Sequence, residues 1–259
     1  MERITSAKNP LIQSLRALRE GRARRETGCI LVEGEVMLRE ALSCGLKPRA
    51  LLVADGHEGI EGLFETSGAR CCSVPEALLA AVCDTKTPQG VCASFEAPRP
   101  LALKELPERL IVLDGVQDPG NVGTIWRTAD AAGFQALIAG AGTADLMSPK
   151  VLRAAMGSGF RLPYVETHNL PDLLDALAES GYTIIVSDLR GDSFYARPKA
   201  GKRVALLVGN EARGVSEASR ERATMRVKLP MRGGAESLNA AVAAGILMYE
   251  LMREIEEEQ

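Results

Sequence analysis

Four nearly uninterrupted apolar runs in the second part of the chain limit most strongly what it can fold into. They are residues 110–116 (LIVLDGV), 136–140 (ALIAG), 183–188 (TIIVSD) and 204–209 (VALLVG). A strand that is apolar at successive positions is typical of a parallel sheet, which helices cover on both faces. Helical stretches separate the runs, as crossover connections between parallel strands require. The sequence therefore predicts an α/β fold with a mostly parallel sheet and helices on both faces.

A proline-rich stretch divides the chain. Pro98, Pro100 and Pro107 lie close together, and proline has no amide hydrogen for a helix or a sheet ladder. We expect a linker over residues 98–107 between two domains, residues 1–97 and residues 108–259. Short strands and helices also alternate in the first domain, which is typical of a small α/β sandwich. Expected helices are 11–26, 36–43, 57–66, 75–83, 121–132, 149–156, 170–180 and 237–253; further strands are 29–34, 50–54, 70–74, 91–95, 163–167 and 225–230.

Several classes of protein are excluded by what the sequence lacks. No stretch approaches the ~20 apolar residues that a membrane span needs, and the charged N-terminus has no apolar signal core. We therefore expect a cytoplasmic protein with no membrane partner. The six cysteines form no C-x-x-C pair and there are only two histidines, so that no metal site is expected.

Polar loops follow the predicted parallel strands. Ligands of such sheets bind outside the carboxyl ends of the strands. The loops at that edge are residues 114–123, 187–192, 209–214 and 229–237. The first, GVQDPGN, lacks the lysine of a P-loop and the third glycine of a dinucleotide loop, which leaves an enzyme with a nucleotide cofactor as a weak alternative.

Three of these loops carry candidate site residues. The first has Asn121-x-Gly123-x-x-x-Arg127, at a predicted helix N-terminus that would attract an anion. A capping asparagine and a surface arginine are the alternative interpretation. Glu211 follows a buried strand, where a solvated turn is the alternative. Ser237 is predicted to be the N-cap of the last helix, with Asn239 in its first turn and its amide free for a ligand.

Together these segments resemble the SpoU (TrmH) family of RNA 2′-O-ribose methyltransferases, in the SPOUT superfamily. The matching motifs are N-x-G-x-x-x-R at 121–127, L-V-G-N-E-x-x-G at 207–214 and L-P-x-x-G-x-x-x-S-L-N at 229–239. The resemblance implies S-adenosylmethionine as cofactor, a deep C-terminal trefoil knot, a homodimer that completes the site, and an N-terminal substrate-binding domain of L30e-like fold. It also implies that the cofactor is bound around Gly209, Leu229, Met231 and Leu238.

The same resemblance implies roles for the candidate catalytic residues. In the family the arginine that matches Arg127 is the proposed base. Arginine stays charged at any relevant pH, so that a clamp on an RNA phosphate is an equal alternative. We expect the remaining catalytic residues to orient Arg127, the ribose hydroxyl and the donor. These residues are Asn121, Glu211, Ser237 and Asn239.

The charge distribution agrees with an RNA partner, although the mean charge does not. The formal net charge is −3, but residues 1–28 hold seven basic groups against three acidic ones. Arginines of the first predicted helix are candidates for contacts to RNA phosphates, and a solvated charged helix is the alternative. They are Arg16, Arg19, Arg22, Arg24 and Arg25.

The predicted function is methylation of a ribose 2′-hydroxyl in 23S rRNA; a tRNA methyltransferase and a non-catalytic RNA-binding or ribosome-assembly module are the alternatives.

Overall fold

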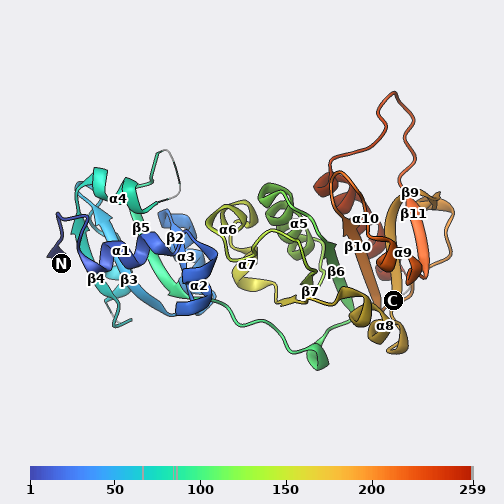
Figure 1. Cartoon of the computed structure of the whole chain (residues 1–259), viewed down its shortest axis with the longest axis horizontal. Coiled ribbons are helices and arrows are strands. Elements are labelled where there is room, and N and C mark those ends of the chain that lie inside the picture. The colour runs from blue at the N-terminus through green and yellow to red at the C-terminus, as the bar shows by residue number, and fades with distance from the viewer. Residues whose placement is uncertain (66, 84, 86, 258–259) are drawn as a thin grey trace. The chain divides into compact units, whose positions relative to one another are not determined.

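The computed structural model of the chain describes residues 1–65, 67–83, 85 and 87–257 (Figure 1). Two compact units make up the chain. The first consists of Met1–Arg99 with Met147–Phe160, and the second of Pro100–Leu146 with Arg161–Gln259. By its contacts the segment 147–160 groups with the first unit, and most of the predicted linker 98–107 groups with the second.

Contacts within the second unit explain why the proline-rich segment is not a free linker. The hydroxyl of Tyr182 donates hydrogen bonds to the carbonyl groups of Leu106 and Pro107, at 3.2 and 2.6 Å. The amide of Leu101 donates to the carbonyl of Tyr164 at 2.8 Å. Proline cannot donate to a ladder, but the carbonyl groups of the segment remain acceptors, and the neighbouring elements use them.

A mixed five-stranded sheet forms the first unit, in the order β1-β4-β3-β5-β2. β5 pairs antiparallel with both β3 and β2, whereas β3, β4 and β1 are parallel. The strands are β1 (Glu2–Arg3), β2 (Cys29–Glu33), β3 (Pro48–Ala54), β4 (Arg70–Val74) and β5 (Val91–Glu96). The helices are α1 (Pro10–Ala17), α2 (Gly21–Thr27), α3 (Glu35–Ser43), the 3-10 turn η1 (Ile60–Phe64), α4 (Glu76–Val82) and α6 (Pro149–Ala155). The short helix α7 (Ser158–Arg161) follows α6, and residue 66 of the expected helix 57–66 lies outside the described residues.

The single helix predicted over residues 11–26 is wrong, because the chain breaks into α1 and α2 at residues 18–20. Arg24 stabilises the break. Its guanidinium donates to the carbonyl groups of Leu18 and Arg19 at 2.6 and 2.7 Å, which satisfies acceptors left open at the end of α1. Arg24 is only 6% exposed, so the prediction that it contacts RNA is also wrong.

A six-stranded sheet forms the second unit, in the order β11-β9-β10-β6-β7-β8. Every neighbouring pair is parallel, which confirms the predicted sheet. The strands are β6 (Arg109–Asp114), β7 (Ala136–Ala139), β8 (Tyr164–Glu166), β9 (Thr183–Ser193), β10 (Val204–Gly209) and β11 (Met225–Lys228). The helices are α5 (Pro119–Ala131), α8 (Leu170–Glu179), α9 (Glu217–Glu221) and α10 (Ala240–Glu257), with the 3-10 turns η2 (Leu103–Glu105) and η3 (Phe194–Ala196).

Helices cover both faces of this sheet, as the apolar runs predict. Leu110 and Val112 of β6 belong to a buried cluster that includes Leu173 and Leu174 of α8. Side chains alternate along a strand, so Ile111 and the other buried residues of opposite parity point to the other face. α10 packs against α5 and β10 on that side. The long loop between β11 and α10 extends beyond the sheet (Figure 1).

Candidate active site

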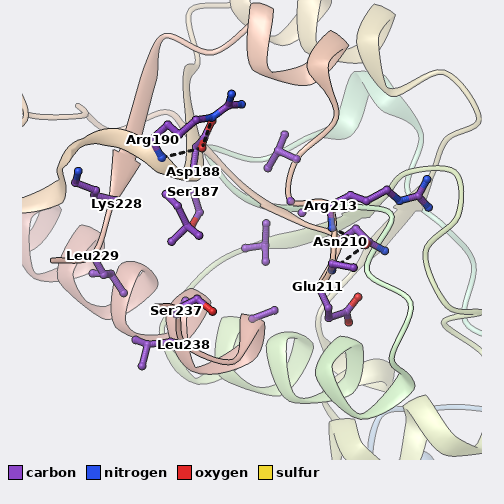
Figure 2. Close-up of a pocket in the computed structure, with 18 of the residues that line it drawn as sticks. Ser187, Asp188, Arg190, Asn210, Glu211, Arg213, Lys228, Leu229, Ser237 and Leu238 are labelled. Carbon is purple, nitrogen blue, oxygen red and sulfur yellow. Dashed lines mark hydrogen bonds and ion pairs between the residues drawn. The ribbon is translucent and has the colours of Figure 1, made fainter. Parts of the chain in front are cut away.

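A cavity of about 550 Å³ lies at the carboxyl edge of the parallel sheet. Its walls come from residues 187–190 of β9 and from the segments that follow β10 and β11 (Figure 2). The sequence places all three segments at this edge, but the loop that it predicts over residues 187–192 is wrong, because β9 continues to Ser193. Leu229, Met231 and Leu238 supply apolar wall, and Gly209 ends the strand at the centre. All four residues expected to bind the cofactor therefore line one cavity.

Gly209 is needed where β10 turns into its loop. A Cβ atom on Gly209 would lie 2.2 Å from the backbone carbon of Gly214. Asn210 holds the same turn, since its Oδ1 accepts hydrogen bonds from the amides of Ala212 and Arg213 and its Nδ2 donates to the carbonyl of Gly115 at 2.9 Å. The close approach leaves room only for glycine, and it fixes the backbone that forms the middle of the cavity wall.

Glu211 joins this loop to the loop before α5. Its carboxylate accepts hydrogen bonds from the amides of Gln117 and Asp118, each at 3.1 Å, and from Nδ2 of Asn121 at 3.0 Å. Burial alone would raise the pKa of Glu211, but the hydrogen bond from Asn121 and those from backbone amides outweigh it and lower the pKa. The carboxylate is therefore ionised at neutral pH and holds the start of α5 in place.

Asn121 connects Glu211 with Asn239, the residue before the last helix. Its Oδ1 accepts a hydrogen bond from Nδ2 of Asn239 at 2.9 Å, so that Glu211, Asn121 and Asn239 form one chain of side chains. These residues lie 90 and 118 positions apart in their two pairs. The structure therefore brings three of the predicted catalytic residues together.

Two details predicted for the last helix are wrong. α10 begins at Ala240, and its N-cap is Asn239, whose Oδ1 accepts from the amides of Ala241 and Val242 at 2.9 and 3.2 Å. Ser237 is exposed, lies before the helix and lines the cavity. The side-chain amide of Asn239 is not free for a ligand, because its Nδ2 donates to Oδ1 of Asn121. The alternative of a capping asparagine at 121 is also wrong, because the N-cap of α5 is Asp118.

Arg127 lies apart from this chain of hydrogen bonds. It is exposed on α5, two turns from the helix N-terminus, and does not line the cavity. Within the described part of the chain, no hydrogen bond or ion pair engages its guanidinium. The guanidinium of Arg127 is thus accessible to solvent.

The cavity wall also contains a buried ion pair that the sequence does not predict. Asp188 follows the apolar core of β9, and its Oδ2 lies 2.7 Å from Nε of Arg220 on α9. Both side chains are about one-tenth exposed, at 9% and 12%. Burial alone would raise the pKa of Asp188, but the amide of Arg190 and the charges of Arg220 and Arg190 lower it overall. Nη2 of Arg220 also donates to the carbonyl of Val215 at 2.9 Å, so that this residue connects β9 with the segment after β10.

Most of the arginines predicted to contact RNA are accessible on the first unit. Arg16, Arg22 and Arg25 are exposed, and Arg19 is half-buried. Arg16 and Arg19 line a shallow hollow of about 420 Å³ on α1. Arg22 forms an ion pair with Glu26 at 2.7 Å, as neighbours one turn apart on a helix commonly do.

Two features are absent from the described residues. No helix in that part of the chain is long and apolar enough to cross a membrane. Nor do three or more histidine, cysteine or acidic side chains gather there in a way that could hold a metal ion.

Comparison with known families identifies the class of protein to which this fold and this site belong. A sequence model described as the SpoU rRNA Methylase family matches residues 108–249, which places the chain among the RNA methyltransferases. The chain belongs to the SpoU rRNA methylase family, and the predicted resemblance is confirmed. A second model, the MRM3-like substrate binding domain, matches residues 9–93.

Similar proteins align over almost the whole chain. The 23S rRNA (guanosine(2553)-2′-O)-methyltransferase RlmP of Bacillus subtilis is 39% identical over 97% of this chain and 99% of its own length. A solved structure of an AdoMet-bound rRNA methyltransferase from Sinorhizobium meliloti superposes with a TM-score of 0.87, at 32% identity over 97% of both chains. The SpoU methyltransferase AviRb from Streptomyces viridochromogenes, in complex with AdoMet, gives a TM-score of 0.85 at 31% identity over 95% of this chain and 98% of its own.

Proposed function

We propose that the chain transfers a methyl group from S-adenosylmethionine to a ribose 2′-hydroxyl of 23S ribosomal RNA. The observation that carries the proposal is the hydrogen-bonded chain of Glu211, Asn121 and Asn239 beside a cavity of about 550 Å³. The relative from Bacillus subtilis, named as a 23S rRNA 2′-O-methyltransferase, supports ribosomal RNA as the substrate.

The cavity suits a donor of this size and chemistry. Ligand cavities of drug-sized molecules measure about 300–1,000 Å³, are largely apolar and carry a few fixed polar groups. We assign the apolar surface of the donor to Leu229, Met231 and Leu238, and its polar groups to backbone atoms around Gly209. S-adenosylmethionine supplies the methyl group in activated form, as a sulfonium.

The residues of the chain must then orient the hydroxyl and hold the RNA. Asn121 and Asn239 are held by each other and by Glu211, so that their side chains are fixed before RNA binds. Ser237 offers an exposed hydroxyl on the cavity wall. We assign Arg127 to clamping an RNA phosphate, since an exposed arginine remains charged and offers a planar fork of donors.

A homodimer would bring a second copy to the exposed side of α10. Val242 and Tyr249 lie two turns apart on one side of that helix and are 52% and 54% exposed. Such an apolar stripe is typical of a surface covered in an assembly. Arg127, on the neighbouring helix α5, would then approach a site that the partner copy completes.

The connections at the C-terminus support the predicted trefoil knot. The chain leaves β10 and crosses to β11 beyond β9, then returns to pack α10 against α5 and β10. The loops that make these two crossings are also cavity walls, so the knot would hold the donor site together. For the first unit we propose RNA binding by the accessible arginines of α1 and α2, on the L30e-like domain that the family resemblance implies.

The ion pair of Asp188 and Arg220 gives a test of the donor site. Replacing Arg220 by methionine leaves a buried carboxylate without its partner and breaks the connection between β9 and the segment after β10, which both line the cavity. We expect the dissociation constant for S-adenosylmethionine to rise about tenfold by calorimetry. The matched variant Arg222→Met removes an arginine that pairs with Asp175 away from the cavity and should bind normally. Equal affinity in the two variants would contradict the assignment of this cavity to the donor.

The function itself is tested by transfer of a labelled methyl group. Purified protein is incubated with S-adenosylmethionine and either 23S rRNA or tRNA from cells that lack the gene, and the modified nucleotide is mapped. We expect 2′-O-methylation of 23S rRNA, and a rate about thirtyfold lower for Arg127→Ala because a charged hydrogen bond to RNA is lost. Arg39→Ala, which removes an exposed arginine paired with Glu35, should leave the rate unchanged. Transfer to tRNA alone would replace the substrate, and donor binding without transfer to either RNA would indicate a binding module.

A further inference from the structure

A second, smaller groove lies beside the donor cavity. It measures about 230 Å³ and shares the residues Leu229, Met231 and Leu238 with that cavity, so that one stretch of loop forms a wall of both. Its other sides come from Tyr195 in η3 and Ile246 in α10. The donor is assigned to the larger cavity, so that this groove is left without an assigned ligand.

Tyr195 is an unusual aromatic residue in this chain. Aromatic residues make up 4% of the sequence, and among the described residues only Tyr195 and Tyr249 are exposed, at 62% and 54%. Every other tyrosine, phenylalanine or tryptophan of the described chain is buried in one of the two cores. An exposed tyrosine ring gains contacts only when another molecule covers it.

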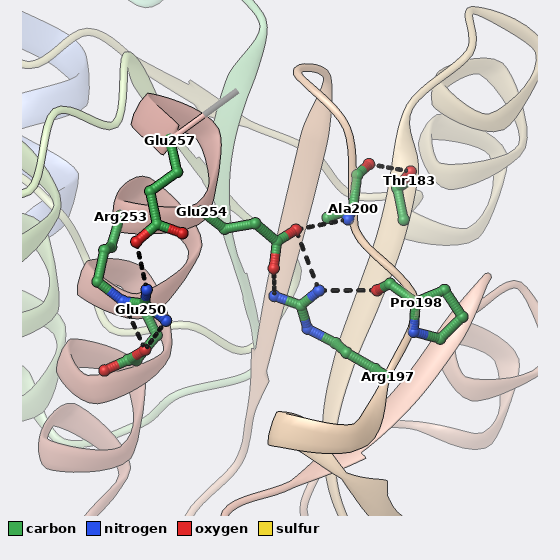
Figure 3. A network of polar contacts seen from close by, with 8 residues as sticks. All are labelled: Thr183, Arg197, Pro198, Ala200, Glu250, Arg253, Glu254 and Glu257. Atoms are coloured by element: carbon green, nitrogen blue, oxygen red, sulfur yellow. Dashed lines mark hydrogen bonds and ion pairs between the residues drawn. The ribbon is translucent and has the colours of Figure 1, made fainter. Parts of the chain in front are cut away.

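The ring of Tyr195 is held from beneath by buried groups. It meets the ring of Phe194 edge-on, with centroids 5.7 Å apart and planes at 85°. Phe194 is 4% exposed, and the guanidinium of Arg197 lies 4.3 Å from the centroid of its ring. Arg197 is itself fixed by a buried ion pair with Glu254 of α10 (Figure 3). The exposed ring is thus positioned before any ligand arrives.

The size and charge of the groove indicate what it binds. A specific protein interface covers about 800 Å² on each partner, whereas this groove has room for one planar group. Arg232 lines it and is exposed, and within the described residues its guanidinium forms no hydrogen bond or ion pair. Gly233 lines it as well, and no atom lies within 4 Å of where its Cβ would be. An aromatic face beside an unpaired arginine suits a nucleotide, with its base on the ring and its phosphate on the cation.

We propose that this groove takes one unstacked base of the RNA, stacked on Tyr195, with Arg232 on a phosphate of the same strand. The proposal rests on the proposed function, in which RNA is the substrate. The groove shares a wall with the donor cavity, so the bound base belongs to a nucleotide near the one that is methylated. Tyr195 is then a positioning residue for the RNA and not a catalytic one.

The test compares the affinity for RNA with the affinity for the donor. For Tyr195→Leu we expect the dissociation constant for 23S rRNA to rise about tenfold, because base stacking on an aromatic ring is lost. The affinity for S-adenosylmethionine and the oligomeric state should not change. Tyr195→Phe keeps the ring and should restore RNA affinity to within about twofold. Leu103→Ala, at a residue of similar exposure (55%) that lines neither cavity, should behave as wild type.

Other results would overturn the inference. Unchanged RNA affinity in Tyr195→Leu would remove the base from this groove, weaker donor binding would make Tyr195 part of the donor site, and a monomer would assign the groove to a second copy. Photocrosslinking of the unaltered protein to 23S rRNA containing 4-thiouridine tests the contact without a variant, and a crosslink should map to the peptide that contains Tyr195. Failure of the wild-type protein to methylate either RNA would contradict the proposed function, whereas a normal rate in wild type together with unchanged RNA affinity in Tyr195→Leu contradicts only this inference.

Discussion

Replacing Glu211 by glutamine is expected to lower the rate of methyl transfer by about two to three orders of magnitude while the protein stays folded. The carboxylate accepts hydrogen bonds from three N–H groups, namely two backbone amides and Nδ2 of Asn121. A glutamine side chain has one acceptor oxygen and turns its own donor toward those donors. The start of α5 loses its attachment to the loop after β10, and Asn121 no longer holds Asn239 in place.

Single-turnover transfer at saturating S-adenosylmethionine measures this effect, with circular dichroism to follow the fold. Glu236→Gln is a matched control, because Glu236 is an exposed carboxylate of the loop between β11 and α10 and lacks hydrogen bonds within the described chain. It should retain the wild-type rate. If Glu211→Gln were also as active as wild type, the hydrogen-bonded chain would have no part in the reaction.

The effect of acid on this site has a definite sign. The pKa of Glu211 is lower in the folded protein than in an unfolded chain. The stabilisation that its carboxylate provides is therefore complete above the ordinary glutamate pKa and is lost as the pH falls through the lowered, folded value. Around neutral pH, the difference in the free energy of unfolding between wild type and Glu211→Gln should therefore stay constant as the pH is varied.

The sequence could predict the sheet because its signals are local and consistent. Apolar runs buried on both faces specify a parallel sheet, and the rule that ligands bind at the carboxyl edge then selects the loops that line the cavity. The contacts of Glu211 with Asn121 and of Asn121 with Asn239 could not be predicted from spacing. They join residues 90 and 118 positions apart, and only the order of the strands brings them together.

The wrong predictions share a physical cause, since tertiary contacts override local propensity. Residues 11–26 have the composition of one helix, but the buried guanidinium of Arg24 stabilises a break after α1. Ser237 is a good N-cap by residue type, yet Asn239 caps α10. Its Nδ2 donates to Asn121, and this contact holds its Oδ1 where the amide of Ala241 can donate to it. Asp188 was detectable, as a carboxylate directly after the apolar run of a buried strand. Its partner Arg220 was not, because the short helix α9 has no apolar pattern of its own.

The second large effect is expected for the buried ion pair of Arg197 and Glu254, which attaches α10 to the chain before β10 (Figure 3). Nη2 of Arg197 lies 2.9 Å from Oε2 of Glu254, and Arg197 also donates to the carbonyl of Pro198 at 2.8 Å. Glu254 accepts a further hydrogen bond from the amide of Ala200, at 2.8 Å. Replacing Arg197 by methionine leaves that carboxylate buried without its cation, and we expect the free energy of unfolding to fall by about 3 kcal/mol.

Denaturant unfolding at neutral pH measures this loss, and Arg253→Met on the same helix is the control. Arg253 pairs with Glu250 and Glu257 in solvent, and water screens such pairs, so that no measurable change is expected. Burial alone would raise the pKa of Glu254, but Arg197 and the amide of Ala200 lower it overall. The contribution of the pair is therefore complete above the ordinary glutamate pKa and disappears as the pH falls through the lowered value.

The double variant Arg197→Met with Glu254→Leu removes both charges and should recover most of the lost stability, because the cost arises from one unpaired charge and not from the absence of the pair. A double variant as unstable as Arg197→Met alone would instead place the cost in the lost packing of Arg197 over Phe194.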